Sequence, residues 1–290
     1  MQATVETFFD PTTFTYSYVV KDPHSAACVI IDSVLDYEPA SGRVDTTSAQ
    51  QIIDYVTANS LCVEWILDTH VHADHLSAGG YLQRKLGGKT AIGCQVQKVQ
   101  QTFAEVFNLG SDFAVDGQQF DQLLSGDSAF RVGDMTGHVL ATPGHTPGCV
   151  TYVFPGMAFV GDTLFMPDYG TARTDFPGGD AATLYQSIQQ ILALPKDTKL
   201  YLCHDYGTNE RKEFSYLTTV AEQRVSNIHV RDGIAIDDFV SMREGRDKEL
   251  AAPRLLLPAV QFNIRGGNFP PAEDNGTRYF KIPINADACG

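Results

Sequence analysis

The pattern of apolar and polar residues opens with two predicted strands. Residues 14–20 alternate between apolar and polar side chains, which is typical of a strand with one buried face. Residues 28–32 contain a continuous apolar run, and the Asp22-Pro23-His24 segment between the two has the composition of a turn. The chain is therefore expected to begin with antiparallel strands.

Predicted strands and helices then alternate over most of the chain. Apolar runs at 63–67 and 199–203 predict strands. Apolar residues at helical spacing predict four helices, at 49–58, 76–86, 95–107 and 181–194. Capping residues precede two of them, namely Thr46-Thr47-Ser48 before the first and Asp180 before the last. This order indicates an α/β (α+β) protein.

The last eighty residues have a different pattern. Helices are expected at 214–226 and 237–244, an irregular run at 253–271, and a short strand at 279–282. No fixed-period repeat and no convincing linker separates this part from the rest. We expect a catalytic domain over 1–210 and a C-terminal extension over 211–290 that packs on the same domain.

Composition and charge restrict the possible partners. The chain has 290 residues, 43% of them hydrophobic, and a formal net charge of −14. This charge argues against nucleic acid or an anionic membrane as a partner, because either would require a basic face. The N-terminus has no signal-like segment, and six scattered cysteines without a CxxC pair are expected to be reduced thiols. Together these features predict a cytoplasmic protein.

The candidate chemistry lies in loops that follow predicted strands. The first loop, after residues 63–67, holds three histidines and an aspartate within six residues, and further single candidates follow later runs. The set consists of His70, His72, Asp74, His75, His145, Asp162 and His204. Imidazole and carboxylate are the ligands that zinc and non-haem iron prefer, and His145 stands in a Pro-Gly-His-Thr-Pro-Gly turn that would hold it rigidly. We expect these residues to converge on one metal site.

These motifs resemble the metallo-β-lactamase superfamily. The resemblance rests on Thr-His-x-His-x-Asp-His at 69–75, the turn at 143–148, Gly-Asp-Thr at 161–163, and His204. It implies a four-layer αββα sandwich with the metal at the edge between two sheets. Residues 172–176, 204–206 and 263–267 further resemble the glutathione-persulfide dioxygenases, although Thr171-Ala172 stands where vertebrate members have cysteine-glycine.

The narrower resemblance implies a specific centre. One Fe(II) per chain would be held by His70, His145 and Asp162, and open positions would remain for substrate and O2. His72, Asp74, His75 and His204 would then orient the ligands and water. The substrate, glutathione persulfide, carries two carboxylates. Candidates for binding it are Arg173, Tyr206, Lys212 and Arg265.

Two alternatives stay open at this point. A glyoxalase II-type hydrolase would use all seven candidate residues to hold two metals and would cleave a glutathione thioester. A non-catalytic family member would have kept the fold without a metal, but it would be expected to lose the 70–75 histidines. The resemblance also implies a homodimer, and any rhodanese partner would be a separate protein.

Overall fold

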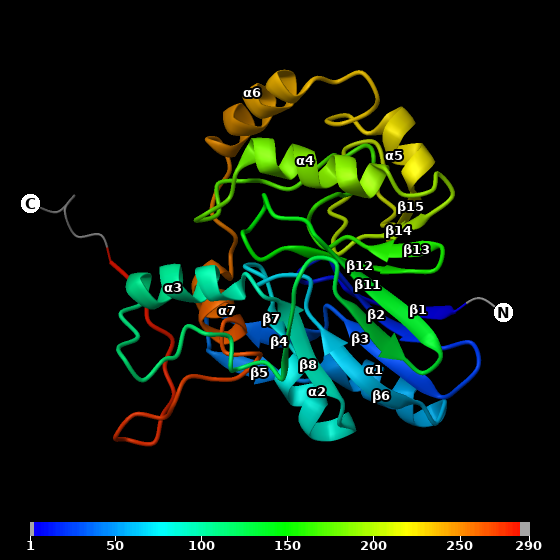
Figure 1. Cartoon of the computed structure of the whole chain (residues 1–290). Helices are drawn as coiled ribbons and strands as arrows, with labels where there is room; N and C mark the ends of the chain where they lie inside the picture. Colours follow the sequence, from blue (N-terminus) through cyan, green and yellow to red (C-terminus); the bar gives the residue numbers. More distant parts are fainter. Residues whose placement is uncertain (1–2, 285–290) are drawn as a thin grey trace, which may run out of the picture.

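Two six-stranded sheets form the centre of the protein (Figure 1). The computed structural model describes residues 3–284. The first sheet has the order β1 (Thr4–Asp10), β2 (Thr15–Lys21), β3 (Ala27–Ile31), β6 (Cys62–Leu67), β8 (Lys89–Gly93), β9 (Gln122–Leu124). The second has the order β10 (Ala129–Val132), β11 (Met135–Ala141), β12 (Val150–Phe154), β13 (Met157–Phe159), β14 (Lys199–Tyr201), β15 (Leu217–Thr219). A small third sheet joins β5 (Arg43–Asp45), β4 (Val34–Glu38) and β7 (Leu76–Ser77).

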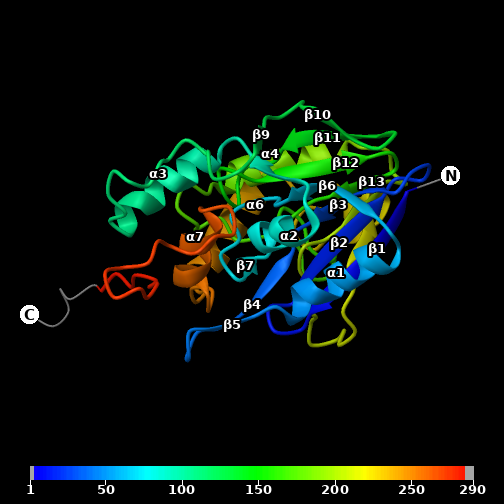
Figure 2. The same ribbon diagram turned by 90° about the horizontal axis from the view of Figure 1, so that it is seen from below.

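Helices cover the outer face of each sheet. On the first sheet lie α1 (Thr47–Ala58) and α2 (Gly79–Leu86), and on the second lie α4 (Ala181–Leu192) and α5 (Val220–Ser226), with α6 (Ile236–Asp247) packed on α4 (Figures 1 and 2). At one end, α3 (Val96–Val106) and α7 (Leu256–Asn263) share a buried cluster. This arrangement confirms the expected αββα sandwich.

Strand β3 shows why its sequence is continuously apolar. Val29 and Ile31 point into the cluster between the two sheets, where they pack with residues such as Tyr152. Cys28 and Ile30 point the other way and pack under α1 and α2. Because both faces of this strand are buried, alternation with polar residues disappears.

The expected opening hairpin and most expected helices are confirmed. Strands β2 and β3 pair antiparallel, and α1 to α4 occupy the four predicted segments to within a few residues. Asp180 caps α4 by accepting a hydrogen bond from the Thr183 amide. At α1, however, Thr46 makes no capping bond, and the first amides of the helix donate instead to Asp45 and Asp36.

The expectations for the C-terminal part were wrong in three places. Residues 217–219 form β15, so the helix there begins only at Val220. The run 253–271, expected to be irregular, contains α7. Residues 279–282 form no strand. The sequence pattern did not predict α7 because residues 259–263 are all buried, so this helix lacks the one-sided apolar stripe that marks a surface helix. The domain boundary at residue 210 stays a prediction.

Within residues 3–284, no helix is long and apolar enough to cross a membrane. The cysteines in this range, Cys28, Cys62, Cys94, Cys149 and Cys203, are free thiols, as expected. Cys289 lies outside the described residues.

Candidate metal centre

Four loops bring the predicted ligands to one edge of the sandwich. The loop after β6 carries His70, His72, Asp74 and His75, and the turn between β11 and β12 carries His145. Asp162 follows β13, and His204 follows β14. Since β13 and β14 are parallel neighbours, their carboxyl ends open at the same edge. All seven predicted residues therefore meet, as expected from the sequence.

The seven side chains fall into two groups. In the first group, ligand atoms of His70, His145 and Asp162 lie within 4.8 Å of one another. Asp162 Oδ2 is 3.8 Å from His70 Nε2 and 3.6 Å from His145 Nε2. We call this group the histidine-aspartate triad.

The second group consists of His72, Asp74, His75 and His204, whose ligand atoms also lie within 4.8 Å of one another. His204 Nε2 is 3.1 Å from Asp74 Oδ2 and 3.4 Å from Asp162 Oδ1. Asp162 thus lies between the two groups. We call the second group the four-residue pocket.

The polar atoms of these groups fit metal binding. Within the described residues, six of their buried nitrogen and oxygen atoms have no hydrogen-bond partner, namely His70 Nε2, His72 Nδ1, Asp74 Oδ2, His75 Nε2, Asp162 Oδ1 and His204 Nε2. Two of these, Asp74 Oδ2 and His204 Nε2, lie 3.1 Å apart and form an ion pair only while His204 is protonated. A buried unpaired polar atom costs about 1–3 kcal/mol, so six in one place require compensation. Coordination to a cation supplies it, and the donor set of imidazole and carboxylate suits zinc or iron.

The outer nitrogens of three histidines have acceptors that fix the ring orientation. His145 Nδ1 donates to the Arg173 carbonyl at 2.8 Å. Thr69 Oγ1 donates to Asp32 at 3.0 Å, so it accepts from His70 Nδ1, also at 3.0 Å. His72 Nε2 donates to Asp32 Oδ1 at 3.1 Å. In each ring the remaining nitrogen then carries a lone pair toward the centre.

Sequence reasoning missed the supporting roles of Asp32 and Asn263. Asp32 follows the apolar strand β3, which was a usable signal, but its link to Thr69 spans 37 residues. Asn263 on α7 donates to the carbonyls of His72 and His75 and accepts from the Ser77 amide, each at 2.8 Å. A residue almost two hundred positions away thus fixes the ligand loop.

The electrostatics around His70, His72 and Asp74 favour the forms that bind metals, whereas Asp74 and Asp162 outweigh burial at His204 and raise the pKa of that imidazole. Burial, reinforced by the neighbouring imidazoles, lowers the pKa of His70 and His72 well below the ordinary value, so both are neutral. Burial alone would raise the pKa of Asp74, but His204 and His75 outweigh it and lower that pKa well below the ordinary value. Neutral imidazole and ionised carboxylate are the coordinating forms.

A cavity of about 420 Å³ opens onto the centre. Asp74, His145 and Asp162 line it together with two predicted substrate residues, Arg173 and Tyr206. The Tyr206 ring stacks on the His204 ring at 5.6 Å between centroids.

The other two predicted substrate residues do not line this cavity. Lys212 donates to the Thr208 carbonyl, and the Arg265 guanidinium lies 4.5 Å over the Phe113 ring. Arg243, Arg246 and Arg254, which line the cavity from α6 and the segment after it, were not predicted.

Comparison with known proteins places this geometry in a family. A family model described as the metallo-beta-lactamase superfamily matches residues 10–204. The chain belongs to the metallo-beta-lactamase superfamily. Within this superfamily, a probable metallo-hydrolase of Burkholderia pseudomallei is 53% identical over 98% of this chain and 99% of its own length. Glyoxylase B2 of Dictyostelium discoideum is 48% identical over 98% of both chains.

The persulfide dioxygenases of the superfamily are more distant in sequence. Human persulfide dioxygenase ETHE1 is 30% identical over 89% of this chain and 87% of its own length. The crystal structure of ETHE1 from Myxococcus xanthus, 27% identical, superposes with a TM-score of 0.73 and covers 91% of this chain and 100% of that one. The superfamily is therefore shown, whereas the narrower resemblance to the dioxygenases is weaker than the similarity to proteins named as metallo-hydrolase or glyoxylase.

Proposed function

We propose that this metal-dependent superfamily member is a persulfide dioxygenase that converts glutathione persulfide, O2 and water into glutathione and sulfite. The observation that carries the proposal is the histidine-aspartate triad, whose ligand atoms form a compact group that approaches the four-residue pocket through Asp162. Two histidines and one carboxylate with open positions are the ligand set of non-haem Fe(II) oxygenases. Similarity to ETHE1 proteins over about nine-tenths of the chain supports the same reaction.

The residues of the chain would bind and orient the substrate. Arg173 already pairs with Asp175 and donates to the Ala251 carbonyl. Within residues 3–284, Arg246 and Arg254 enter no ion pair with a carboxylate, although Arg246 lies 3.4 Å from His229 Nε2. We therefore assign the two carboxylates of glutathione to Arg246 and Arg254, which line the cavity beside the metal ligands.

With its carboxylates at Arg246 and Arg254, such a substrate would extend its sulfur end toward the triad, whose His145 and Asp162 line the same cavity. His145 and Asp162 form its inner wall, and Phe165 and Tyr206 bring apolar surface that excludes water. An Fe(II) ion held by His70, His145 and Asp162 would supply the redox chemistry with O2. The chain itself would supply orientation, because the Arg173 carbonyl fixes His145 and the Thr69 hydroxyl fixes His70.

A second candidate function is hydrolysis of a glutathione thioester at a two-metal centre. Sequence identity favours it, since the relatives at about half identity are named as metallo-hydrolase and glyoxylase. The unpaired atoms of the four-residue pocket also suit a second cation. Both candidates use a glutathione-derived substrate, so the arginine assignment serves either. The third possibility, a metal-free member, conflicts with seven intact ligand residues.

One experiment separates the two reactions. The protein is purified anaerobically, its metal content is measured, and it is then given glutathione persulfide with O2 or S-D-lactoylglutathione without O2. We expect about one iron per chain, O2 uptake and sulfite release. Two metals per chain, with thioester hydrolysis and no O2 uptake, would replace the dioxygenase by the hydrolase.

The partner predictions are proposals of the same kind. We propose that the protein is a homodimer and that a separate rhodanese would exchange persulfide with it. Light scattering coupled to size-exclusion chromatography tests the first, and persulfide transfer from a purified rhodanese tests the second.

A further inference from the structure

The end of the β1–β2 hairpin lies against the four-residue pocket. Asp10 and Thr15 are paired residues at this end, and the intervening turn contains Thr13. Thr15 is fully buried, and its Oγ1 lies 3.4 Å from His75 Nδ1 and 3.3 Å from His204 Nδ1. One hydroxyl thus lies within reach of the outer nitrogens of both imidazoles.

The hydrogen bonds of this hairpin have one consistent direction. Thr13 Oγ1 donates to Asp10 Oδ2 at 2.6 Å, because a carboxylate accepts only. With its single proton used, Thr13 Oγ1 accepts from Thr15 Oγ1 at 2.8 Å. The Thr15 oxygen then has lone pairs but no proton for the imidazoles, so it can only accept from His75 and His204.

We infer that Thr15, anchored through Thr13 to Asp10, is a positioning residue that holds the imidazoles of His75 and His204 in the Nδ1–H form. In that tautomer Nε2 carries the lone pair, and Nε2 is the unpaired buried atom of both residues. The same logic operates at the triad, where Thr69 and Asp32 hold His70. The hairpin would therefore set the metal affinity of the four-residue pocket, whichever reaction the enzyme performs.

The two imidazoles depend on Thr15 to different degrees. His204 Nδ1 also lies 3.3 Å from the Phe14 carbonyl, which can accept the same proton. His75 Nδ1 lies 3.3 Å from Asp74 Oδ1, an atom of a prospective ligand. Because the second acceptor of His204 is a backbone group that survives substitution, we expect His75 to be the more sensitive of the two.

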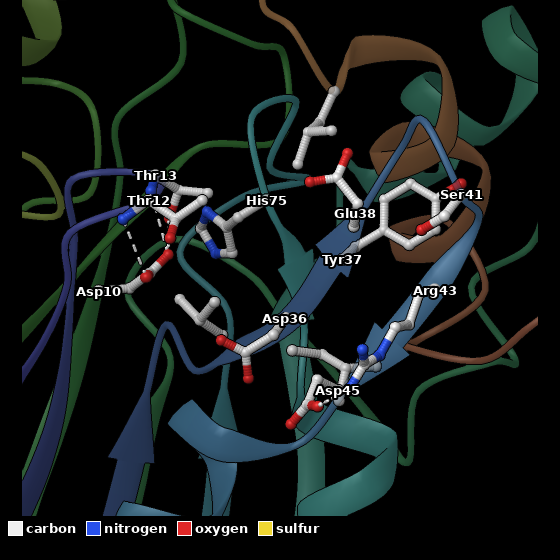
Figure 3. Close-up of a pocket in the computed structure, with 13 residues that line it drawn as sticks. Asp10, Thr12, Thr13, Asp36, Tyr37, Glu38, Ser41, Arg43, Asp45 and His75 are labelled. Atoms are coloured by element: carbon white, nitrogen blue, oxygen red, sulfur yellow. Dashed lines mark hydrogen bonds and ion pairs between the residues drawn. The ribbon is translucent and has the colours of Figure 1, made fainter.

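The outer part of this hydrogen-bond chain borders a second cavity. Figure 3 shows Asp10, Thr12 and Thr13 on one side of it with His75 next to them. This cavity has a volume of about 340 Å³, and Asp36, Glu38 and Asp45 contribute further carboxylates. Asp10 is nevertheless buried and fully engaged with Thr12 and Thr13, which suits an anchor better than a ligand.

Thr15→Val tests the inference, because valine keeps the branched shape and removes the hydroxyl. Thr15→Ser keeps the hydroxyl and is the matched control. The metal-free proteins are titrated with Zn(II) against a chromophoric chelator, which gives the affinity of each zinc. We expect Thr15→Val to weaken one of the two zincs 10–100-fold, the usual effect of losing such a support, and to leave the affinity for the other within twofold.

Imidazole nitrogen NMR of the metal-free proteins gives a second readout. The neutral rings of His75 and His204 in wild type should carry their proton at Nδ1, and Thr15→Val should disturb the tautomer of His75 first. This readout also serves if wild type binds a single zinc. Unchanged tautomers together with unchanged zinc affinities in Thr15→Val would overturn the inference, as would equal losses in Thr15→Ser. If Thr15→Val does not fold, Thr13→Val takes its place, because it removes the hydroxyl acceptor of Thr15 and leaves only the Thr13 carbonyl at 3.5 Å; the same changes are then expected in the same direction.

Discussion

Replacing Asn263 by leucine removes the link between the C-terminal extension and the ligand loop. The asparagine amide makes three hydrogen bonds of 2.8 Å, to the carbonyls of His72 and His75 and from the Ser77 amide. Asn263 is 2% exposed, and the three residues that it contacts are fully buried. Water therefore cannot replace the lost bonds without local opening.

The expected cost follows from these three groups. A buried backbone group that loses its partner costs about 1–3 kcal/mol, so three such groups give a lower bound of roughly 3 kcal/mol. Leucine has as many side-chain heavy atoms as asparagine and is favourable in a helix, so cavity and propensity contribute little, and its bulkier methyl groups can only add to the cost. Against a typical total stability of about 5–15 kcal/mol, this loss is large.

Urea unfolding of the metal-free proteins measures the loss directly. The matched control is Asn275→Leu, which makes the same change at an exposed position of the extension and should cost less than about 1 kcal/mol. A cost below about 1 kcal/mol for Asn263→Leu would refute the reasoning, because it would mean that the ligand loop satisfies its backbone without α7. Zinc titration of the same variant should show weakened binding, since His72 and His75 lose their fixed backbone.

Three further predictions concern the metal, the substrate and pH. Asp162→Ala should lose metal and activity together, because Asp162 lies between both ligand groups. Elemental analysis and turnover measure the two losses, and full metal occupancy in the variant would show that the triad does not hold the metal. Arg246→Met should raise KM for the glutathione substrate about tenfold with little change in kcat, since one charge-assisted hydrogen bond is lost. The control is Arg224→Met, which should leave KM unchanged because Arg224 pairs with Asp232 outside the cavity. Burial, with the charges of Arg243 and Arg246, lowers the pKa of His229 to about 4. Neutral His229 therefore contributes to the free energy of unfolding above pH 6.5, and this contribution, at most about 3 kcal/mol, is lost as the pH falls toward 4. His229→Gln should flatten this pH dependence in urea unfolding, and an identical slope in the variant would assign it to other groups.

The sequence predicted the ligands because their chemistry is local. His70, His72, Asp74 and His75 are crowded within six residues, and the strands before each loop have clear apolar patterns. The supports could not be predicted in the same way, because Thr15 is 60 residues from His75 and 189 from His204. A threonine in a strand is ordinary until the fold places it beside an imidazole.

The arginines that we propose to bind the substrate could not be predicted from the sequence for a related reason. The guanidinium groups of Arg246 and Arg254 come from α6 and from the segment that follows it. Only the packing of α6 against α4 brings that part of the chain to the cavity. Arg173, selected from its motif, contributes its backbone carbonyl to His145 while its side chain pairs with Asp175. A motif identified the right loop but could not show which atoms of it face the ligand.

The two candidate reactions make opposite demands on the four-residue pocket. Hydrolysis at a two-metal centre requires this pocket to hold a cation, whereas the dioxygenase uses the triad alone. Thr15 contacts His75 and His204 but none of His70, His145 or Asp162, so Thr15→Val separates the two demands. A hydrolase would lose activity in this variant in proportion to the fraction of four-residue pockets without a cation, and added zinc would restore the activity. A dioxygenase would retain iron and O2 uptake, so the response to the loss of one buried hydroxyl group distinguishes the two enzymes.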